Sequence, residues 1–193
     1  MTTTDHSVAL LSRALDQTGD IIAAIKPDQA HLPTPCNSWD VEALVTHVVD
    51  EVQRLAEMAE TGKRGSGDGA PLGDDWSGAY RAAADSLKAA WASSGALDRM
   101  HELPGVEVPA SWAVGQHITE VVIHGWDIAK ATGQSTDDLD PEVGEAAFDW
   151  GKANLIPEFR GHEADGAMIG HEVQVGPDAP LYTRLAAFGG RQP

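Results

Sequence analysis

Glu120 and His124 are the residues whose types and spacing most directly suggest chemistry in this sequence. They lie four positions apart in residues 110–133, ASWAVGQHITEVVIHGWDIAKATG, where apolar residues cover most of a helical circumference. Side chains four apart in a helix stand one turn above the other on one face. Because zinc and similar divalent ions bind carboxylate oxygens and imidazole nitrogens, this pair forms part of a possible metal site.

A third ligand would have to come from another helix, since such sites use three protein ligands and leave a position open for water or substrate. His47 is the only histidine away from the ends of the three other long helices that the sequence predicts. His47 falls at the edge of the apolar face of its helix, and a side chain at such an edge points obliquely toward a neighbouring helix. His47, Glu120 and His124 are therefore the candidate ligands.

The polar stripe of residues 110–133 also has a simpler interpretation. An amphipathic helix can show a stripe of His117, Glu120, His124 and Asp127 to water. Two details favour a site instead: the stripe lacks lysine and arginine, and two histidines are uncommon on an exposed face. From the residues alone, both interpretations stay open.

Three neighbours of the candidate ligands have alternative roles. His117 is a fourth or substitute ligand, or a pocket-lining or surface histidine, and we favour the second role. Asp127 orients an imidazole, or is an ordinary salt-bridge or surface charge. Glu51 approaches the metal from the second helix, or is likewise an ordinary salt-bridge or surface charge.

Cys36 lies just before a predicted helix, where a reactive thiol would have a lowered pKa. No histidine stands beside it in the sequence, so we favour a buried structural cysteine. Trp39 and Trp126 are expected to pack the interior rather than to touch substrate.

Helical periodicity and capping residues predict four long helices with little strand. The second helix has Ser38 as its N-cap, the third has Asp74 or Asp75, and Asp140 followed by Pro141 opens a fifth helix. The remaining predicted elements are helices at about residues 5–26, 110–133 and 180–188, an extended stretch at 106–108 and a strand at 171–175. This pattern predicts an all-α four-helix bundle over residues 1–135, with residues 136–193 as a helical extension packed on it.

Composition narrows the classes of partner. The chain has 193 residues, 42% hydrophobic, with 30 acidic against 13 basic side chains and a formal net charge of −17. Such a charge argues against nucleic acids and anionic membranes as partners. The single cysteine, and the lack of a signal peptide or a transmembrane run, predict a cytoplasmic protein.

Two segments resemble a known family. PTPCNSWDVEALVTHVVDEV resembles the "TPCxGWxVxDLVxHL" segment of the mycothiol-dependent maleylpyruvate isomerase N-terminal family. ITEVVIHGWDIAKATGQ resembles that family's "E-x-x-x-H-G-W-D-L-A-x-A-T-G" helix, and the order and spacing agree over about the first 135 residues. The resemblance implies a DinB-like four-helix bundle. It also implies that the family's three metal ligands correspond to His47, Glu120 and His124.

The resemblance further implies a divalent metal, most simply zinc, and mycothiol as a thiol cosubstrate. In that interpretation the metal deprotonates a thiol, and the thiolate attacks a small electrophile in a transfer or isomerisation. The isomerases carry a further C-terminal domain, for which the chain after residue 133 is too short.

Two other functions fit the same residues. The site could activate water, as in a small metal-dependent hydrolase, or it could belong to a non-catalytic metal-binding or ligand-sensing module. The sequence names no catalytic or cofactor-binding residue beyond the candidate ligands. It also leaves the oligomeric state open, with a homodimer as one expectation.

Overall fold

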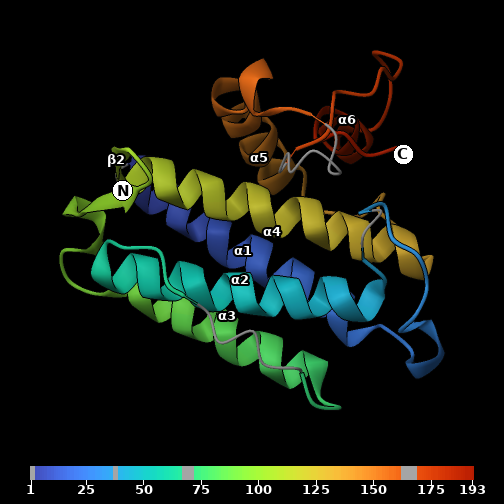
Figure 1. The fold of residues 1–193 in the computed structure, drawn as a ribbon, viewed down its shortest axis with the longest axis horizontal. Coiled ribbons are helices and arrows are strands. Elements are labelled where there is room, and N and C mark those ends of the chain that lie inside the picture. The colour runs from blue at the N-terminus through green and yellow to red at the C-terminus, as the bar shows by residue number, and fades with distance from the viewer. Residues whose placement is uncertain (1–2, 37–38, 67–71, 162–168) are drawn as a thin grey trace.

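Four long helices form the body of the protein in the computed structural model, which describes residues 3–36, 39–66, 72–161 and 169–193. In Figure 1, α1 lies beside α4 and α2 lies beside α3, and each helix also packs against a member of the other pair. The bundle helices are α1 (Thr3–Ala23), α2 (Val41–Thr61), α3 (Trp76–Ala92) and α4 (Ala110–Thr132). This arrangement confirms the predicted all-α four-helix bundle.

Helix α4 is the central element. It packs on α1 and α2 inside the bundle, and on its other side it carries α5 (Pro141–Asn154) and α6 (Leu181–Phe188), as Figure 1 shows. Sixteen of its residues are buried. These contacts on several sides explain why its sequence is apolar over most of the circumference.

Capping side chains begin three of the helices. The α2 N-cap is Asp40, whose Oδ1 accepts a hydrogen bond from the Ala43 amide at 2.9 Å. The predicted cap, Ser38, lies outside the described residues. Asp75, rather than Asp74, caps α3. Asp140 caps α5 as predicted, with Pro141 in the first turn.

The only strands of the described residues form a hairpin before α4. β2 (Val106–Pro109) confirms the predicted extended stretch and pairs antiparallel with β1 (Met100–Leu103), which the sequence analysis did not identify. The strand predicted at residues 171–175 is wrong. No strand among the described residues pairs with this segment, and the Val173 amide donates instead to the Ala187 carbonyl near the end of α6.

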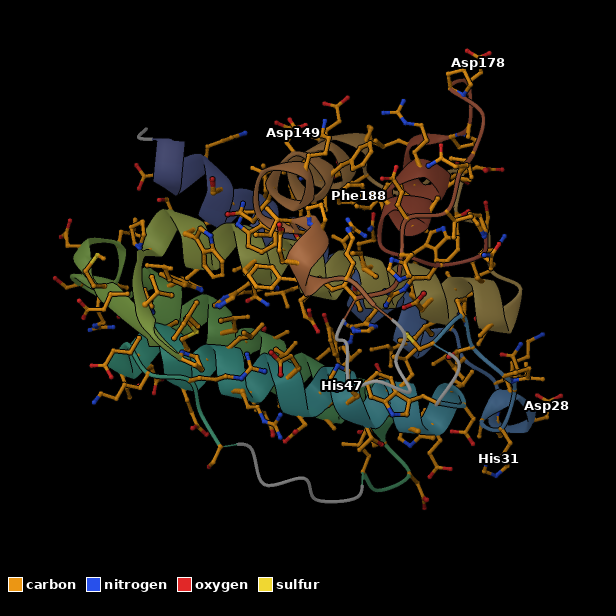
Figure 2. All side chains as sticks on the ribbon, turned by 45° about the horizontal axis from the view of Figure 1, so that its top comes forward. Asp28, His31, His47, Asp149, Asp178 and Phe188 are labelled. Atoms are coloured by element: carbon orange, nitrogen blue, oxygen red, sulfur yellow. The ribbon has the colours of Figure 1, made fainter. Side chains whose placement is uncertain are left out.

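The last part of the chain returns to α4. Phe188, the last residue of α6, is labelled in Figure 2, and its ring contacts that of Phe148 on α5 at 5.5 Å between centroids. The residues after α6 then run back toward the C-terminal half of α4, where Arg191 contacts Asp127. The boundary at residue 135 stays a prediction.

Three short 3₁₀ turns complete the described fold: η1 (Pro27–Gln29), η2 (Ala96–Asp98) and η3 (Pro157–Phe159). Among the helices of the described residues, none combines the length and apolarity that a membrane crossing requires.

Gly125 allows α1 and α4 to approach closely, because a Cβ there would lie 2.6 Å from Thr18 Oγ1. Thr18 is fully buried, and its hydroxyl donates to the Val121 carbonyl at 3.2 Å. We expect Gly125→Ala to lower the free energy of unfolding by about 1–3 kcal/mol through overpacking, as measured by urea denaturation. In a Thr18→Ala background the same change should be neutral or stabilising, because alanine favours helix. An equal cost in both backgrounds would contradict this account.

Candidate metal centre

The three predicted ligands come together between α2 and α4. Glu120 Oε1 lies 3.3 Å from His124 Nε2 on its own helix and 3.6 Å from His47 Nε2 on α2. One ligand atom from each residue lies within 4.8 Å of the other two. Figure 2 shows His47 on α2. The two helices therefore supply a compact set of two imidazoles and one carboxylate.

The distances between these donor atoms suit a small tetrahedral ion. Bonds of about 2.0–2.1 Å at tetrahedral angles separate two ligand atoms by about 3.3–3.4 Å. The separations of 3.3 and 3.6 Å from Glu120 Oε1 are close to that value. Two nitrogens and an oxygen are also ligands that zinc accepts, with a fourth position left open. The residues present thus fit the metal that the resemblance implies, and their role as ligands stays a prediction.

Trp39 fixes the position of His47. The two rings are stacked, with centroids 4.3 Å apart and an interplanar angle of 29°. The His47 ring in turn meets the His124 ring edge-on at 5.0 Å. Trp39 is half-buried and packs against the bundle core as expected, and it also packs directly on a candidate ligand. Trp126, in contrast, is 2% exposed and packs in the core as predicted.

Opposite charges hold the site together. Burial raises the pKa of Glu120, but hydrogen bonds from His124 and His47 outweigh it and leave the pKa well below its usual range. Burial lowers the pKa of His124, but Asp127, Cys36 and Glu120 outweigh it and leave the pKa well above its usual range. These interactions favour an imidazolium between carboxylates. A cation that binds at His124 Nε2 would therefore release a proton.

Asp127 lies on the opposite side of the His124 ring from Glu120. Its Oδ2 is 3.2 Å from His124 Nδ1, and the carboxylate is fully buried. Arg191 donates to both carboxylate oxygens, at 2.9 Å for the closest contact. Asp127 therefore contacts the imidazole and also forms a salt bridge, and the alternative of a surface charge is wrong. Burial raises its pKa, but the Arg191 charge and the His124 hydrogen bond together hold it below its ordinary value.

Cys36 belongs to the same cluster. Its thiol donates to Asp127 Oδ2 at 3.2 Å, accepts from Arg191 Nη2 at 3.3 Å, and lies 3.9 Å from His124 Nδ1. Cys36 is therefore half-buried rather than buried and has a histidine neighbour, contrary to expectation, while its structural role stays a prediction. The loop before α2 brings the thiol to a histidine 88 positions away in the sequence, a contact that local sequence spacing cannot reveal.

Arg191 is the residue of this cluster that sequence analysis missed. It follows α6 in the short segment GGRQP, where no periodicity or motif marks a function. The available signal was chemical: a buried carboxylate such as Asp127 requires a cation nearby.

Glu51 lies near the candidate ligands but is already paired. It lines a narrow recess together with Glu120, His124 and three valines, Val48, Val52 and Val121. Arg64 donates to both oxygens of the Glu51 carboxylate, at 2.7 and 2.6 Å. Glu51 therefore lies beside the candidate ligands with its charge balanced by arginine.

His117 lies outside the candidate metal set. Its side chain is fully buried, so the predicted surface or pocket-lining position is wrong. Its Nδ1 accepts from Trp91 Nε1 at 3.3 Å, which assigns the proton to Nε2. Trp91 also packs on His101, with centroids 5.3 Å apart. His117 thus belongs to a separate aromatic cluster in the core.

A family model for the mycothiol maleylpyruvate isomerase N-terminal domain matches residues 11–129, a range that contains all three candidate ligands. The chain belongs to this family. Uncharacterized proteins of Mycobacterium tuberculosis strains CDC 1551 and H37Rv are each 34% identical to it over 184 residues, which is 93% of this chain and 94% of theirs.

Two solved structures share the fold. The crystal structure of the mycothiol-dependent maleylpyruvate isomerase has a TM-score of 0.63 and 18% identity, and the match covers 88% of this chain and 77% of the isomerase. A histidine-to-alanine mutant of that isomerase has a TM-score of 0.56 and 18% identity, with 76% and 70% covered. The likeness confirms the bundle architecture expected from the family resemblance.

The buried His117 predicts a loss of stability in acid. Burial, then the charges of His101 and Arg64, lowers the pKa of His117 from 6.5 to about 3. Between these values the unfolded chain binds a proton that the folded chain does not, so stability falls as the pH falls. We expect His117 to account for a loss of about 2 kcal/mol between pH 6.5 and 4.5.

Urea denaturation of His117→Asn at several pH values tests this contribution. The asparagine Oδ1 can replace Nδ1 as acceptor for Trp91 but does not titrate. The variant should therefore lose less stability than the unmutated protein over the same pH range. Parallel pH profiles would exclude His117 as the titrating group.

Proposed function

We propose that His47, Glu120 and His124 bind a divalent metal, with zinc as the favoured ion, and that the protein is a metal-dependent enzyme using a low-molecular-weight thiol. Mycothiol is the proposed thiol, and a small electrophile is the second substrate of a transfer or isomerisation. The observation that carries the proposal is the approach of two imidazole nitrogens to one carboxylate oxygen at 3.3 and 3.6 Å.

Family membership supports the thiol. The matched model bears the name of a mycothiol enzyme domain, and the solved isomerase with the same bundle is described as mycothiol-dependent. A metal bound at these residues would supply a positive charge that lowers the pKa of a thiol or of water. The proposed metal site therefore rests on the geometry, and the proposed thiol rests on family membership.

The protein residues have distinct tasks in this proposal. Glu120 provides a negative charge beside His124 on its own helix and opposite His47 across the interface between α2 and α4. Trp39 holds the His47 ring by stacking, which reduces the freedom of the least buried histidine of the set. The valines of the recess, Val48, Val52 and Val121, keep the neighbourhood of Glu120 and His124 apolar. A low local dielectric strengthens electrostatic interactions there.

Loss of a ligand should remove the metal. We expect the unmutated protein, purified without a nickel column, to contain about one metal ion per chain, and His47→Ala and His124→Ala to contain almost none. Elemental analysis measures the content, and circular dichroism checks that helicity is kept. His117→Asn is the matched control and should retain the metal. Equal metal in His124→Ala and the unmutated protein would show that the ligand assignment is wrong.

Thiol chemistry should depend on that metal. With mycothiol and an electrophile such as chlorodinitrobenzene or maleylpyruvate, we expect thiol consumption or isomerisation that stops after chelation and returns when zinc is added. His47→Ala should lack the activity. Hydrolysis without any thiol would instead identify a hydrolase. Tight metal binding with neither activity would identify a binding module.

A further inference from the structure

We propose that Arg191 and Asp127 are positioning residues that orient His124, so that its Nε2 and not its Nδ1 faces the metal. The inference rests on the proposed function, because it assumes a metal at His47, Glu120 and His124. It adds a role for the C-terminal segment, which carries Arg191 into the site from 64 positions away in the sequence.

The His124 ring has a different partner on each nitrogen. Nε2 is 3.3 Å from Glu120 Oε1, within the candidate metal set, and Nδ1 is 3.2 Å from Asp127 Oδ2. An ionised carboxylate only accepts hydrogen bonds, so this contact assigns a proton to Nδ1. The hydrogen bond made by one imidazole nitrogen sets which nitrogen binds a metal. Asp127 thereby selects Nε2.

Asp127 can act in this way only if its own charge is balanced. The carboxylate is fully buried, and a buried unpaired charge is strongly unfavourable. Arg191 supplies a fork: Nε lies 3.2 Å from Oδ1, and Nη2 lies 2.9 Å from Oδ2. The guanidinium is itself held by Nη1, which donates to the Gly189 carbonyl at 2.8 Å. Its planar geometry fixes the carboxylate plane as a single ammonium could not.

The Arg191 guanidinium also lies against a second group of possible metal ligands. Cys36, His124 and Asp127 also offer ligand atoms within 4.8 Å of one another. Arg191 Nη2 donates to the Cys36 sulfur at 3.3 Å as well as to Asp127. A cation already lies against two of these three residues, so the Nε2 side is the one that remains for a metal.

Metal affinity tests the inference. Removing a partner of this kind typically weakens metal binding about 10- to 100-fold, and we expect that loss for Arg191→Met in zinc competition against a chromophoric chelator. Arg184→Met is the matched control, because it removes the same charge from α6, where Arg184 packs on Phe148. It should bind zinc like the unmutated protein. Circular dichroism of each variant checks helicity.

Two further variants separate positioning from general structure. Arg191→Lys keeps the charge without the fork and should recover part of the affinity. Asp127→Asn should weaken binding, and the Arg191→Met/Asp127→Asn double variant should lose less than the two single losses combined, because both act through His124. The visible spectrum of bound Co²⁺ should change in Arg191→Met at unchanged helicity, which a remote structural effect would not produce.

Three outcomes would overturn the inference. Zinc affinity in Arg191→Met equal to that of the unmutated protein would show that Arg191 does not position His124. A metal bound by the unmutated protein with a thiolate-to-cobalt charge-transfer band would show that the metal lies on the Nδ1 side of His124, against Cys36, and not at Nε2. If the unmutated protein binds no metal, the proposed function fails and the inference with it. The unmutated protein therefore distinguishes the two failures.

Discussion

The pairing of buried and half-buried charges along α4 is the constraint on which the site depends. Glu120, His124 and Asp127 occupy successive turns of a helix that is otherwise enclosed by apolar contacts. A buried ionised group is tolerated only with a partner of opposite charge or with several hydrogen bonds. His124 lies between the two carboxylates, and Arg191 balances the one that is fully buried. The polar stripe is therefore a chain of mutually dependent interactions.

The bundle supplies these partners from distant parts of the chain. α2 brings His47 to one side of His124, and Trp39, which lies just before the α2 N-cap, stacks on His47. The loop before α2 and the segment after α6 bring Cys36 and Arg191 to the other side. Metal and ligand sites in helix bundles are commonly built from facing helices. Here the contacts made by the C-terminal segment extend that principle to a residue beyond the bundle.

The cluster around Trp91 shows that a second histidine of α4, His117, has entirely different surroundings. His117 is one turn before Glu120, yet its ring is bonded to the Trp91 indole on α3 and packs in the core. Its pKa is lowered by burial and by positive neighbours, whereas that of His124 is raised by carboxylates that outweigh burial. Helical spacing alone does not distinguish His117 from His124, because the difference lies in the side chains that each ring contacts in the folded protein.

The sequence by itself determined the helices, because their apolar periodicity and their caps are local properties. The Asp140–Pro141 start and the segment before Gly133 appear in the structure as predicted. It also put Glu120 and His124 on one face, because helix geometry fixes that relation. Only the tertiary structure decided which side chains meet that face. His47, Cys36 and Arg191 reach it through packing between segments far apart in the chain, and no local spacing encodes those contacts.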